Sequence, residues 1–411
     1  MMTFRRKAAP MTRWMRQLLT NPPDAYLPSA PWRRATIRCC LAIAGLSLAA
    51  CQATSTEDLL SVAPDLPIPA QETIGAGPTM IALLLPRSGP EPGASRSRDF
   101  FDGAKLAATE LGDGQLRVTV YDTAGRPENT ADLAGQAIAA GARLIVAPPD
   151  PDGLARIAAI NPVARPPVIA LSERGGSAGI FAFASDSVDS AIDGARAAVA
   201  AGQTRVLVVE PEGFPAEDHD RFARGIARNG GKLVGRVYYP PADAQIGPAL
   251  KAAQPLFGKA DTVVIFGSGR APAVVAQSIA AQGLGGTITA LVGNSGWPQE
   301  LYTVPVLDGA LVPMPDQESL KHIAGRYQSA AGRPLSYDAA FAFDAVAIAA
   351  GLVRQRGPAA LTTSALLTDA GFRGATGLFR FRKDGSVERR HVIYRIEKGR
   401  LVLLQGDAGG F

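Results

Sequence analysis

Short apolar segments alternate with helical stretches through most of the chain. The first four apolar runs are aliphatic or β-branched and only five or six residues long, which is typical of buried parallel strands. They are residues 80–85, 116–121, 143–147 and 167–171. Helices are predicted between them at residues 97–111, 128–140 and 151–160. This alternation predicts an open parallel sheet covered by helices on both faces.

The same alternation resumes after a further extended run at residues 181–184. The predicted helices are residues 187–201, 215–228, 245–257 and 271–282. The predicted strands are residues 205–209, 232–239, 262–266 and 287–292. We therefore expect an α/β protein of two Rossmann-like lobes with parallel sheets, each able to bind ligands beyond the carboxyl ends of its strands.

The C-terminal part has a different character. Helices are predicted at residues 316–331 and 337–354, and the second is almost wholly apolar apart from Asp344. It is too short to span a bilayer, so we predict a buried helix that crosses between the lobes. Strand alternation follows at residues 378–382, 387–396 and 401–404. The Asp384–Gly385 pair between the first two runs predicts a C-terminal β-hairpin extension.

The first 50 residues differ from the rest in charge. They hold eight cations and one acid, which gives this segment a net charge of +7. The net charge of the whole chain is +5, so the residues after position 50 carry about −2. Arg33, Arg34 and Arg38 precede an apolar run at residues 39–50. This order predicts a signal peptide over residues 1–50. Without it the chain has no net positive charge to attract phosphates, which argues against nucleic acid as a partner.

The three cysteines, Cys39, Cys40 and Cys51, all lie within the first 51 residues, which excludes a disulfide framework downstream. The sequence Leu48-Ala49-Ala50-Cys51 resembles the lipobox of bacterial lipoproteins. That resemblance implies that Cys51 becomes lipidated and anchors the protein to a membrane facing the periplasm. The lack of Asp at position 52 favours the outer membrane, with the inner membrane as the alternative.

Residues 51–78 are rich in Pro, Ala, Ser and Thr, and we expect the lipidated cysteine followed by a flexible tether. The folded part is expected at residues 79–404. Lobe 1 would take about 79–184 plus part of 310–355. Lobe 2 would take about 185–309 plus the C-terminal strands.

Two segments at opposite ends of this domain resemble a known family. Residues 81–89, Ile-Ala-Leu-Leu-Leu-Pro-Arg-Ser-Gly, resemble the first strand and ligand loop of type I periplasmic binding proteins. Residues 371–381, Gly-Phe-Arg-Gly-Ala-Thr-Gly-Leu-Phe-Arg-Phe, resemble the closing segment of the leucine/isoleucine/valine-binding branch. Within that branch the chain is most similar to lipoprotein activators of penicillin-binding proteins. It departs from the enteric activator, because only residues 52–78 are available for the helical-repeat domain found there.

The resemblance implies ligand loops after the first, third and fourth strands, where hydroxyl and backbone N–H groups hold an amino-acid carboxylate. Ser88 and Gly89 match the first loop. In the third loop, Pro149 and Asp150 stand where the family usually has Gly and Ser. Proline lacks an N–H donor and Asp150 would repel a carboxylate. We favour the alternative that Asp150 caps a helix with Pro151 at its first position.

Ser172 and Glu173 match the fourth loop, and the second lobe offers Glu210, Phe214 and Asn294. Glu173 or Glu210 could hold an ammonium group, and Phe214 could cover an apolar group. Packing or surface roles are equally open for each of these residues.

Catalytic readings find little support in the sequence. Residues 175–179, Gly-Gly-Ser-Ala-Gly, fit the GxSxG elbow, but another extended run follows where a hydrolase needs a helix. His219, His322 and His391 are isolated, and no pattern predicts a metal or other cofactor. We therefore expect a non-enzymatic protein. The preferred hypothesis is a regulator of a penicillin-binding protein (a peptidoglycan synthase), and the alternative is a receptor for amino acids or related solutes that feeds an ABC transporter.

Overall fold

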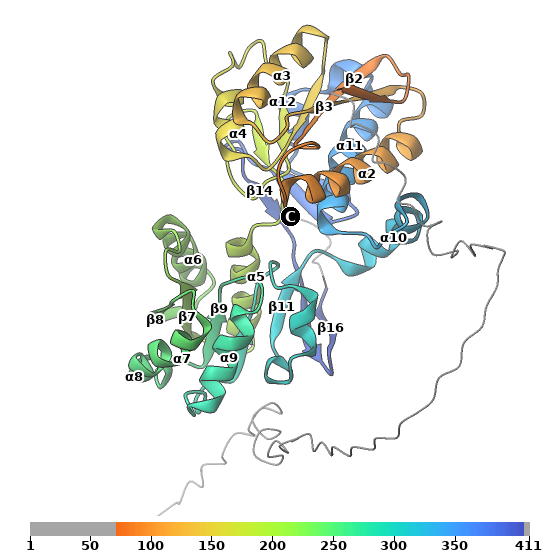
Figure 1. Ribbon diagram of the computed structural model, residues 1–411. Coiled ribbons are helices and arrows are strands. Elements are labelled where there is room, and N and C mark those ends of the chain that lie inside the picture. The colour runs from red at the N-terminus through yellow and green to blue at the C-terminus, as the bar shows by residue number, and fades with distance from the viewer. Residues whose placement is uncertain (1–70, 407–411) are drawn as a thin grey trace, which may run out of the picture.

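The computed structural model describes residues 71–406, which form two α/β lobes (Figure 1). Lobe 1 is built on a six-stranded sheet of order β1-β3-β2-β4-β5-β6, and lobe 2 on a seven-stranded sheet of order β16-β15-β11-β10-β9-β7-β8. The strands of the first sheet are β1 (Gln71–Ile74), β2 (Thr79–Leu85), β3 (Leu116–Asp122), β4 (Leu144–Ala147), β5 (Val168–Ala170) and β6 (Ile180–Ala182). All of them run parallel except β1.

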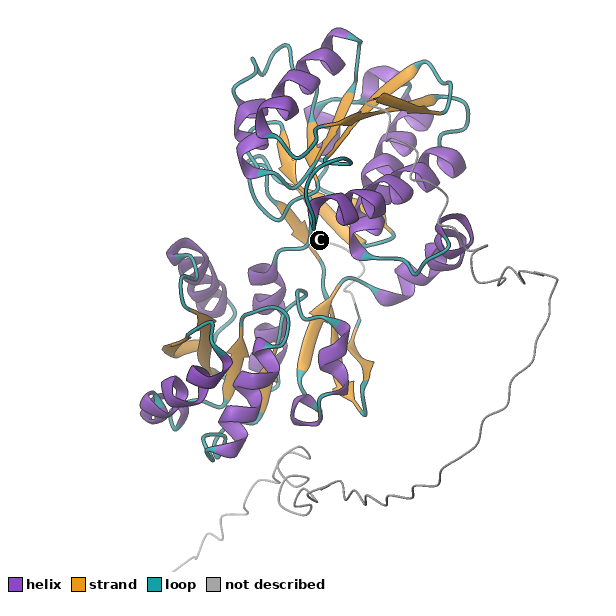
Figure 2. Ribbon diagram, viewed as in Figure 1, coloured by secondary structure: helices purple, strands orange, loops and turns teal. Residues whose placement is uncertain are grey.

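Helices cover both faces of the lobe 1 sheet, as Figure 2 shows. Every residue of β2 is buried: Ile81, Leu83 and Leu85 face one core, and their even-numbered neighbours face the other. The first core is closed by α2 (Gly93–Leu111) and α11 (Tyr337–Arg356), the second by α3 (Pro127–Ala139) and α4 (Pro151–Ala158). Burial on both faces explains why the strands are continuous apolar runs in the sequence.

Two sequence-based predictions for lobe 1 need correction. Residues 71–74, expected in the tether, form β1 and pair antiparallel with the outer edge of β3, which satisfies backbone groups that an open edge would leave exposed. The apolar helix at 337–354 does not cross between lobes. It lies in lobe 1 as α11 and packs closely on α2, where a Cβ on Gly103 would lie 2.0 Å from the carbonyl oxygen of Ala339.

Lobe 2 repeats the layered arrangement. Its parallel strands are β7 (Arg205–Pro211), β8 (Lys232–Tyr239), β9 (Thr262–Ile265), β10 (Ala290–Val292) and β11 (Leu311–Met314). Helices α5 (Ser187–Ala200) and α6 (Ala216–Arg228) cover one face. The other face is covered by α7 (Asp243–Ala252), α8 (Gln254–Phe257) and α9 (Ala271–Ala281), with η2 (Gln299–Thr303) and η3 (Pro305–Leu307). The helix predicted at 245–257 is thus two helices, divided at Ala253, and Pro255 lies in the first turn of the second.

The C-terminal strands are shared between the lobes. Strands β12 (Phe372–Gly374), β13 (Gly377–Phe381) and β14 (Val387–Arg389) form a small antiparallel sheet that packs on lobe 1, and the predicted Asp384–Gly385 turn joins the last two. Strands β15 (Val392–Glu397) and β16 (Arg400–Gln405) extend the lobe 2 sheet. The single strand predicted at 387–396 is therefore wrong: it breaks at Arg390 and His391, where the chain passes between lobes.

A buried polar cluster fixes the small sheet to α11. The Asp344 carboxylate accepts hydrogen bonds from the backbone N–H groups of Ala375 (2.7 Å) and Thr376 (2.8 Å) and from the Thr376 hydroxyl (2.6 Å). Arg389 donates to the same hydroxyl oxygen at 2.9 Å, and its guanidinium lies over the Phe183 ring. These contacts explain why one acid interrupts the apolar helix.

Three connections join the lobes. The first is residues 183–186, between β6 and α5; the second is Pro315–Asp316, between β11 and α10 (Gln317–Ala331); the third is Arg390–His391. After α10 the chain stays in lobe 1 through α11, η4 (Pro358–Ala360) and α12 (Thr363–Leu366). In the part of the chain described here, every helix is too short or too polar to cross a bilayer.

Candidate functional cleft between the lobes

A cleft of about 500 Å³ lies between the two lobes. It is bounded in lobe 1 by the loops after β4 and β5 and by the first turns of α2 and α11, and in lobe 2 by the loop after β10. Two of the three connections, at Ser185 and Pro315, also border it. Its lining residues are Arg96, Pro149, Pro151, Leu171, Ser172, Glu173, Arg174, Ala184, Ser185, Ser295, Gly296, Pro315, Tyr337, Asp338 and Phe341. The cleft therefore lies where parallel sheets are expected to bind ligands, beyond the carboxyl ends of strands.

The predicted lobe 1 residues are only partly gathered in this cleft. Pro149, Ser172 and Glu173 line it. Asp150 is the N-cap residue of α4 with Pro151 at the first helical position, although its side chain makes no capping hydrogen bond. Ser88 is outside the lining, and its N–H donates to Asp122 Oδ1 at 3.1 Å.

Gly89 also lies outside the cleft lining, in the turn after β2. A Cβ at this position would lie 3.1 Å from the backbone nitrogen of Gly125. Close approach of two backbone segments accounts for this glycine without a ligand.

The predicted lobe 2 residues do not line the cleft. Glu210 is fully buried and accepts hydrogen bonds from Arg236 Nε (2.5 Å) and pairs with His219 Nδ1 (2.7 Å). Phe214 packs on Phe266 with 4.7 Å between ring centroids. Asn294 is buried, and its Oδ1 accepts the Gly296 N–H at 2.9 Å. All three side chains are thus engaged within lobe 2, and their role in binding a ligand stays a prediction.

Ion pairs neutralise both arginines of the cleft. Arg96 Nε and Nη2 donate to the two oxygens of Asp338 at 2.7 and 3.0 Å, which is a bidentate pair. Arg174 reaches from lobe 1 to Asp218 at the start of α6, so this bridge spans the two lobes. The sequence did not single out these arginines, because their partners are 242 and 44 residues away.

Glu173 differs from these paired groups. It is exposed to solvent in the cleft, and no cation among residues 71–406 lies within ion-pair distance of its carboxylate. Partial burial and the nearby charge of Asp186 raise its pKa; Arg174, the Ser187 N–H and Arg96 oppose this effect. The cleft thus holds one acid that forms no ion pair with a described residue.

A hydrogen-bond chain lies beside the cleft where two connections meet. His391 Nε2 is 2.9 Å from Ser185 Oγ, and His391 Nδ1 is 2.9 Å from Asp193 Oδ2. Only 1% of the His391 side chain is exposed. Sequence reasoning missed this group because its members are about 200 residues apart.

The hydrogen bonds link Ser185, His391 and Asp193 in the order of a hydrolase triad, but the surroundings of these residues favour a structural role. The nearby backbone N–H groups of Ser295 and Gly296 already donate to Ser190 Oγ and Asn294 Oδ1, which leaves neither for an oxyanion. The GxSxG segment is a turn before β6, not the start of a helix. His391 instead joins the first connection to the third.

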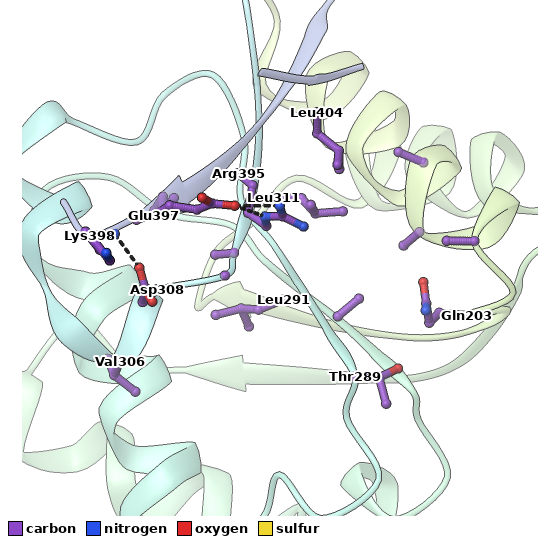
Figure 3. Close-up of a pocket in the computed structure, with 17 residues that line it drawn as sticks. Gln203, Thr289, Leu291, Val306, Asp308, Leu311, Arg395, Glu397, Lys398 and Leu404 are labelled. Carbon is purple, nitrogen blue, oxygen red and sulfur yellow. Dashed lines mark hydrogen bonds and ion pairs between the residues drawn. The ribbon is translucent and has the colours of Figure 1, made fainter. Parts of the chain in front are cut away.

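Other hollows lie within single lobes. The cavity in Figure 3, of about 540 Å³, lies between α5 and the β10, β11 and β15 strands of lobe 2. Some of its labelled polar groups are engaged: the backbone N–H of Lys398 donates to Asp308 at 2.7 Å, and Arg395 pairs with Glu397. A hollow of about 800 Å³ is lined only by lobe 1 residues. Among residues 71–406, no cluster of His, Cys, Asp and Glu is suited to hold a metal ion.

Comparison with solved structures shows the same fold. A putative branched-chain amino acid ABC transporter protein from Rhodospirillum rubrum has a TM-score of 0.68 and 15% identity, covering 79% of this chain and 99% of that one. An ABC transporter substrate-binding protein from Desulfitobacterium hafniense in complex with Leu has a TM-score of 0.58 and 18% identity, covering 79% of this chain and 99% of that one. A solute-binding protein from R. palustris in complex with benzoate has a TM-score of 0.56 and 18% identity, covering 82% of this chain and 98% of that one.

No curated protein sequence matches the chain significantly. The model of a family described as periplasmic binding protein matches residues 78–400, nearly the whole described region. The two-lobed α/β fold and the resemblance to the leucine-binding branch are thereby confirmed. The chain belongs to the periplasmic binding protein family.

Proposed function

We propose that this protein is a non-enzymatic, extracytoplasmic receptor that binds a small solute between its lobes and delivers it to an ABC transporter. The observation that carries the proposal is the cleft itself, about 500 Å³ in volume and bordered by both lobes and two of their connections. Its walls combine apolar residues such as Leu171 and Phe341 with charged ones, as small-molecule sites do.

The arrangement of the connections supports a closing motion. Within residues 71–406, only three short segments join the lobes, and few residues need to change backbone angles for one lobe to rotate against the other. Structural neighbours with this fold include complexes with Leu and with benzoate, and both ligands are small enough for the volume of the cleft. A cavity within one lobe would not be closed by such a rotation.

The preferred hypothesis from the sequence, a regulator of a penicillin-binding protein, stays a prediction. It depends on the resemblance to the activator lipoproteins, on the unusual third loop and on Cys51. Cys51 and the predicted signal peptide lie outside the described residues. A lipid on Cys51 is compatible with either function, because both would act at a membrane surface.

Two substitutions test where a solute binds. Pro149→Trp fills the cleft, whereas Thr289→Trp fills the lobe 2 cavity of Figure 3. Calorimetric titration of the detergent-solubilised full-length protein with L-leucine, benzoate, benzylamine and 3-methylbutylamine should give at least one dissociation constant in the micromolar range, about 8 kcal/mol of binding free energy. Binding should be lost in Pro149→Trp and kept in Thr289→Trp. No binding by any probe, or loss only in Thr289→Trp, would contradict the proposal.

A further inference from the structure

Hydrogen-bond donors in the cleft are largely used within the protein. The Ser172 hydroxyl donates to the Arg174 carbonyl at 2.6 Å, and Ser185 Oγ is in the chain to His391. The N–H groups of Ser295 and Gly296 are bonded to lobe 2 side chains. The two prolines of the third loop have no N–H to offer.

A carboxylate ligand would therefore find few uncommitted side-chain donors, chiefly the hydroxyls of Ser295 and Tyr337, which act as acceptors within the protein. Burying an anion costs several kcal/mol unless hydrogen bonds or a cation compensate for the lost water. Arg96 and Arg174 are the cations of the lining, and each is already paired with an acid, Asp338 and Asp218 respectively. A carboxylate would have to compete with those two acids for the arginines.

The cleft instead offers oxygen acceptors. The Glu173 carboxylate is exposed there without an ion pair to a described residue. The Ser295 hydroxyl oxygen accepts one hydrogen bond, from Ser185 Oγ at 3.2 Å, and it and the Ser172 oxygen keep lone pairs that can accept another. Partial burial and, after it, repulsion from Asp186 disfavour the charged form of Glu173, and a bound cation would offset both. An ammonium or guanidinium group supplies both the positive charge and the N–H donors.

Apolar surface lies in the same cleft. Leu171, Pro149, Tyr337 and Phe341 contribute to the lining. The two aromatic rings belong to the first turns of α11, whose position is fixed by its packing on α2. A ligand with an apolar body next to its charged end would match both parts of this surface.

We infer that the cleft selects small organic cations, amines or guanidinium compounds with an apolar body and no carboxylate, and that Glu173 binds their charged end. The inference rests on the proposed function, because it names the ligand class of the same cleft. It distinguishes this chain from structural neighbours whose complexes contain Leu or benzoate, since both of those ligands carry a carboxylate.

Matched ligand pairs test the inference directly. Benzylamine and benzoate share the same ring and differ in the charge of their polar group. In the second pair, 3-methylbutylamine is leucine without its carboxylate, and 4-methylpentanoate is leucine without its amine. Calorimetric titration of the full-length protein should show each amine binding at least about tenfold more tightly than its carboxylate partner and than L-leucine, a difference of about 1.4 kcal/mol.

Variants then identify the recognition group. Glu173→Gln keeps the shape of the side chain and should weaken amine binding at least about tenfold, as expected for loss of a hydrogen bond to a charged group. Glu128→Gln, an exposed acid on α3 outside the cleft lining, should leave amine binding unchanged. Unchanged thermal unfolding of Glu173→Gln would show that the variant remains folded.

The outcomes separate this inference from the proposed function. Tight binding of the carboxylates with weak binding of the amines would overturn the inference and leave the receptor function standing. Amine binding that is unaffected by Glu173→Gln would overturn the assignment of Glu173. No binding of any probe to a folded protein would overturn both.

Discussion

Two acidic residues of lobe 1, Asp344 and Glu173, differ in how completely the fold satisfies them. Asp344 is 1% exposed and accepts three hydrogen bonds from Ala375 and Thr376, with Arg389 close by. Glu173 is exposed in the cleft and has no ion pair with any described residue. Burial raises the pKa of both carboxyl groups, but only Asp344 is compensated by several donors.

The difference teaches where the protein uses charge for folding and where charge is available for binding. A buried carboxylate without partners would be very unfavourable, so Asp344 is surrounded by donors that hold the small sheet on α11. An acid at the surface of a cleft tolerates an incomplete set of partners because water solvates it. It can then exchange that water for a ligand.

Removing the charge of Asp344 should have the largest effect. Asp344→Asn places an NH₂ group against backbone donors and leaves Arg389 buried without its counter-charge, so the free energy of unfolding should fall by about 3–5 kcal/mol. Urea unfolding followed by circular dichroism measures this loss. Asp132→Asn, at an exposed position on α3, should change stability by less than about 0.5 kcal/mol. Equal effects of the two substitutions would contradict the role given to Asp344.

Asp189 extends the comparison to lobe 2. Its substitution should stabilise the fold, whereas substitution of Asp344 should destabilise it. Partial burial and repulsion from Asp186 raise the pKa of Asp189 to about 6, above its usual 3.8. The folded state therefore binds this proton more tightly than the unfolded state, and the charged form destabilises the fold above pH 6. The penalty disappears as pH falls from about 6 towards 4.

Asp189→Asn should accordingly stabilise the protein at pH 7.5 by about 1 kcal/mol, a value reduced for screening because 41% of the side chain is exposed. The gain over the unmodified protein should vanish near pH 4. Parallel unfolding curves at both pH values give the result. A gain of the same size at pH 4 would show that the charge of Asp189 is not its source.

The bridge from Arg174 to Asp218 should have the smallest effect on stability. The arginine side chain is 45% exposed, so Arg174→Gln should lower the free energy of unfolding by less than about 1 kcal/mol. Because the bridge spans the lobes, small-angle X-ray scattering should show a larger radius of gyration in the variant. Arg98→Gln, which removes an exposed pair within lobe 1, should leave that radius unchanged. An unchanged radius in Arg174→Gln would mean that the bridge does not hold the lobes together.

Most strands and helices could be predicted from the sequence, because parallel strands buried on both faces are short apolar runs between amphipathic helices. The turn at Asp384–Gly385 could also be predicted, because the Asp-Gly pair between two strand-like runs is a local signal for a hairpin. The break at Arg390 and His391 was not, since nothing in the alternation at 387–396 shows that its two halves belong to different sheets. Likewise, the apolar pattern of α11 indicated burial but not the lobe in which it is buried.

The candidate site was predicted only in part for the same reason. Ser172 and Glu173 were selected because they match the fourth ligand loop of the family that the sequence resembles, and they follow a strand, where parallel sheets bind ligands. Glu210 and Asn294 satisfied the same rule but are buried in partnerships within lobe 2. Whether a polar residue can bind a ligand depends on whether other side chains already form hydrogen bonds or ion pairs with it in the folded protein. Those partners are distant in the sequence.

The sequence by itself determined the α/β class and the succession of elements, because hydrophobic periodicity and turn residues are local properties of the chain. The family came from the resemblance of residues 81–89 and 371–381 to known segments. Only the tertiary structure decided which charges are neutralised. It paired Arg96 with Asp338 and left Glu173 in the cleft without an ion pair. Electrostatic and hydrogen-bonding partners are set by distances in space, and residues separated by hundreds of positions become neighbours only when the lobes fold.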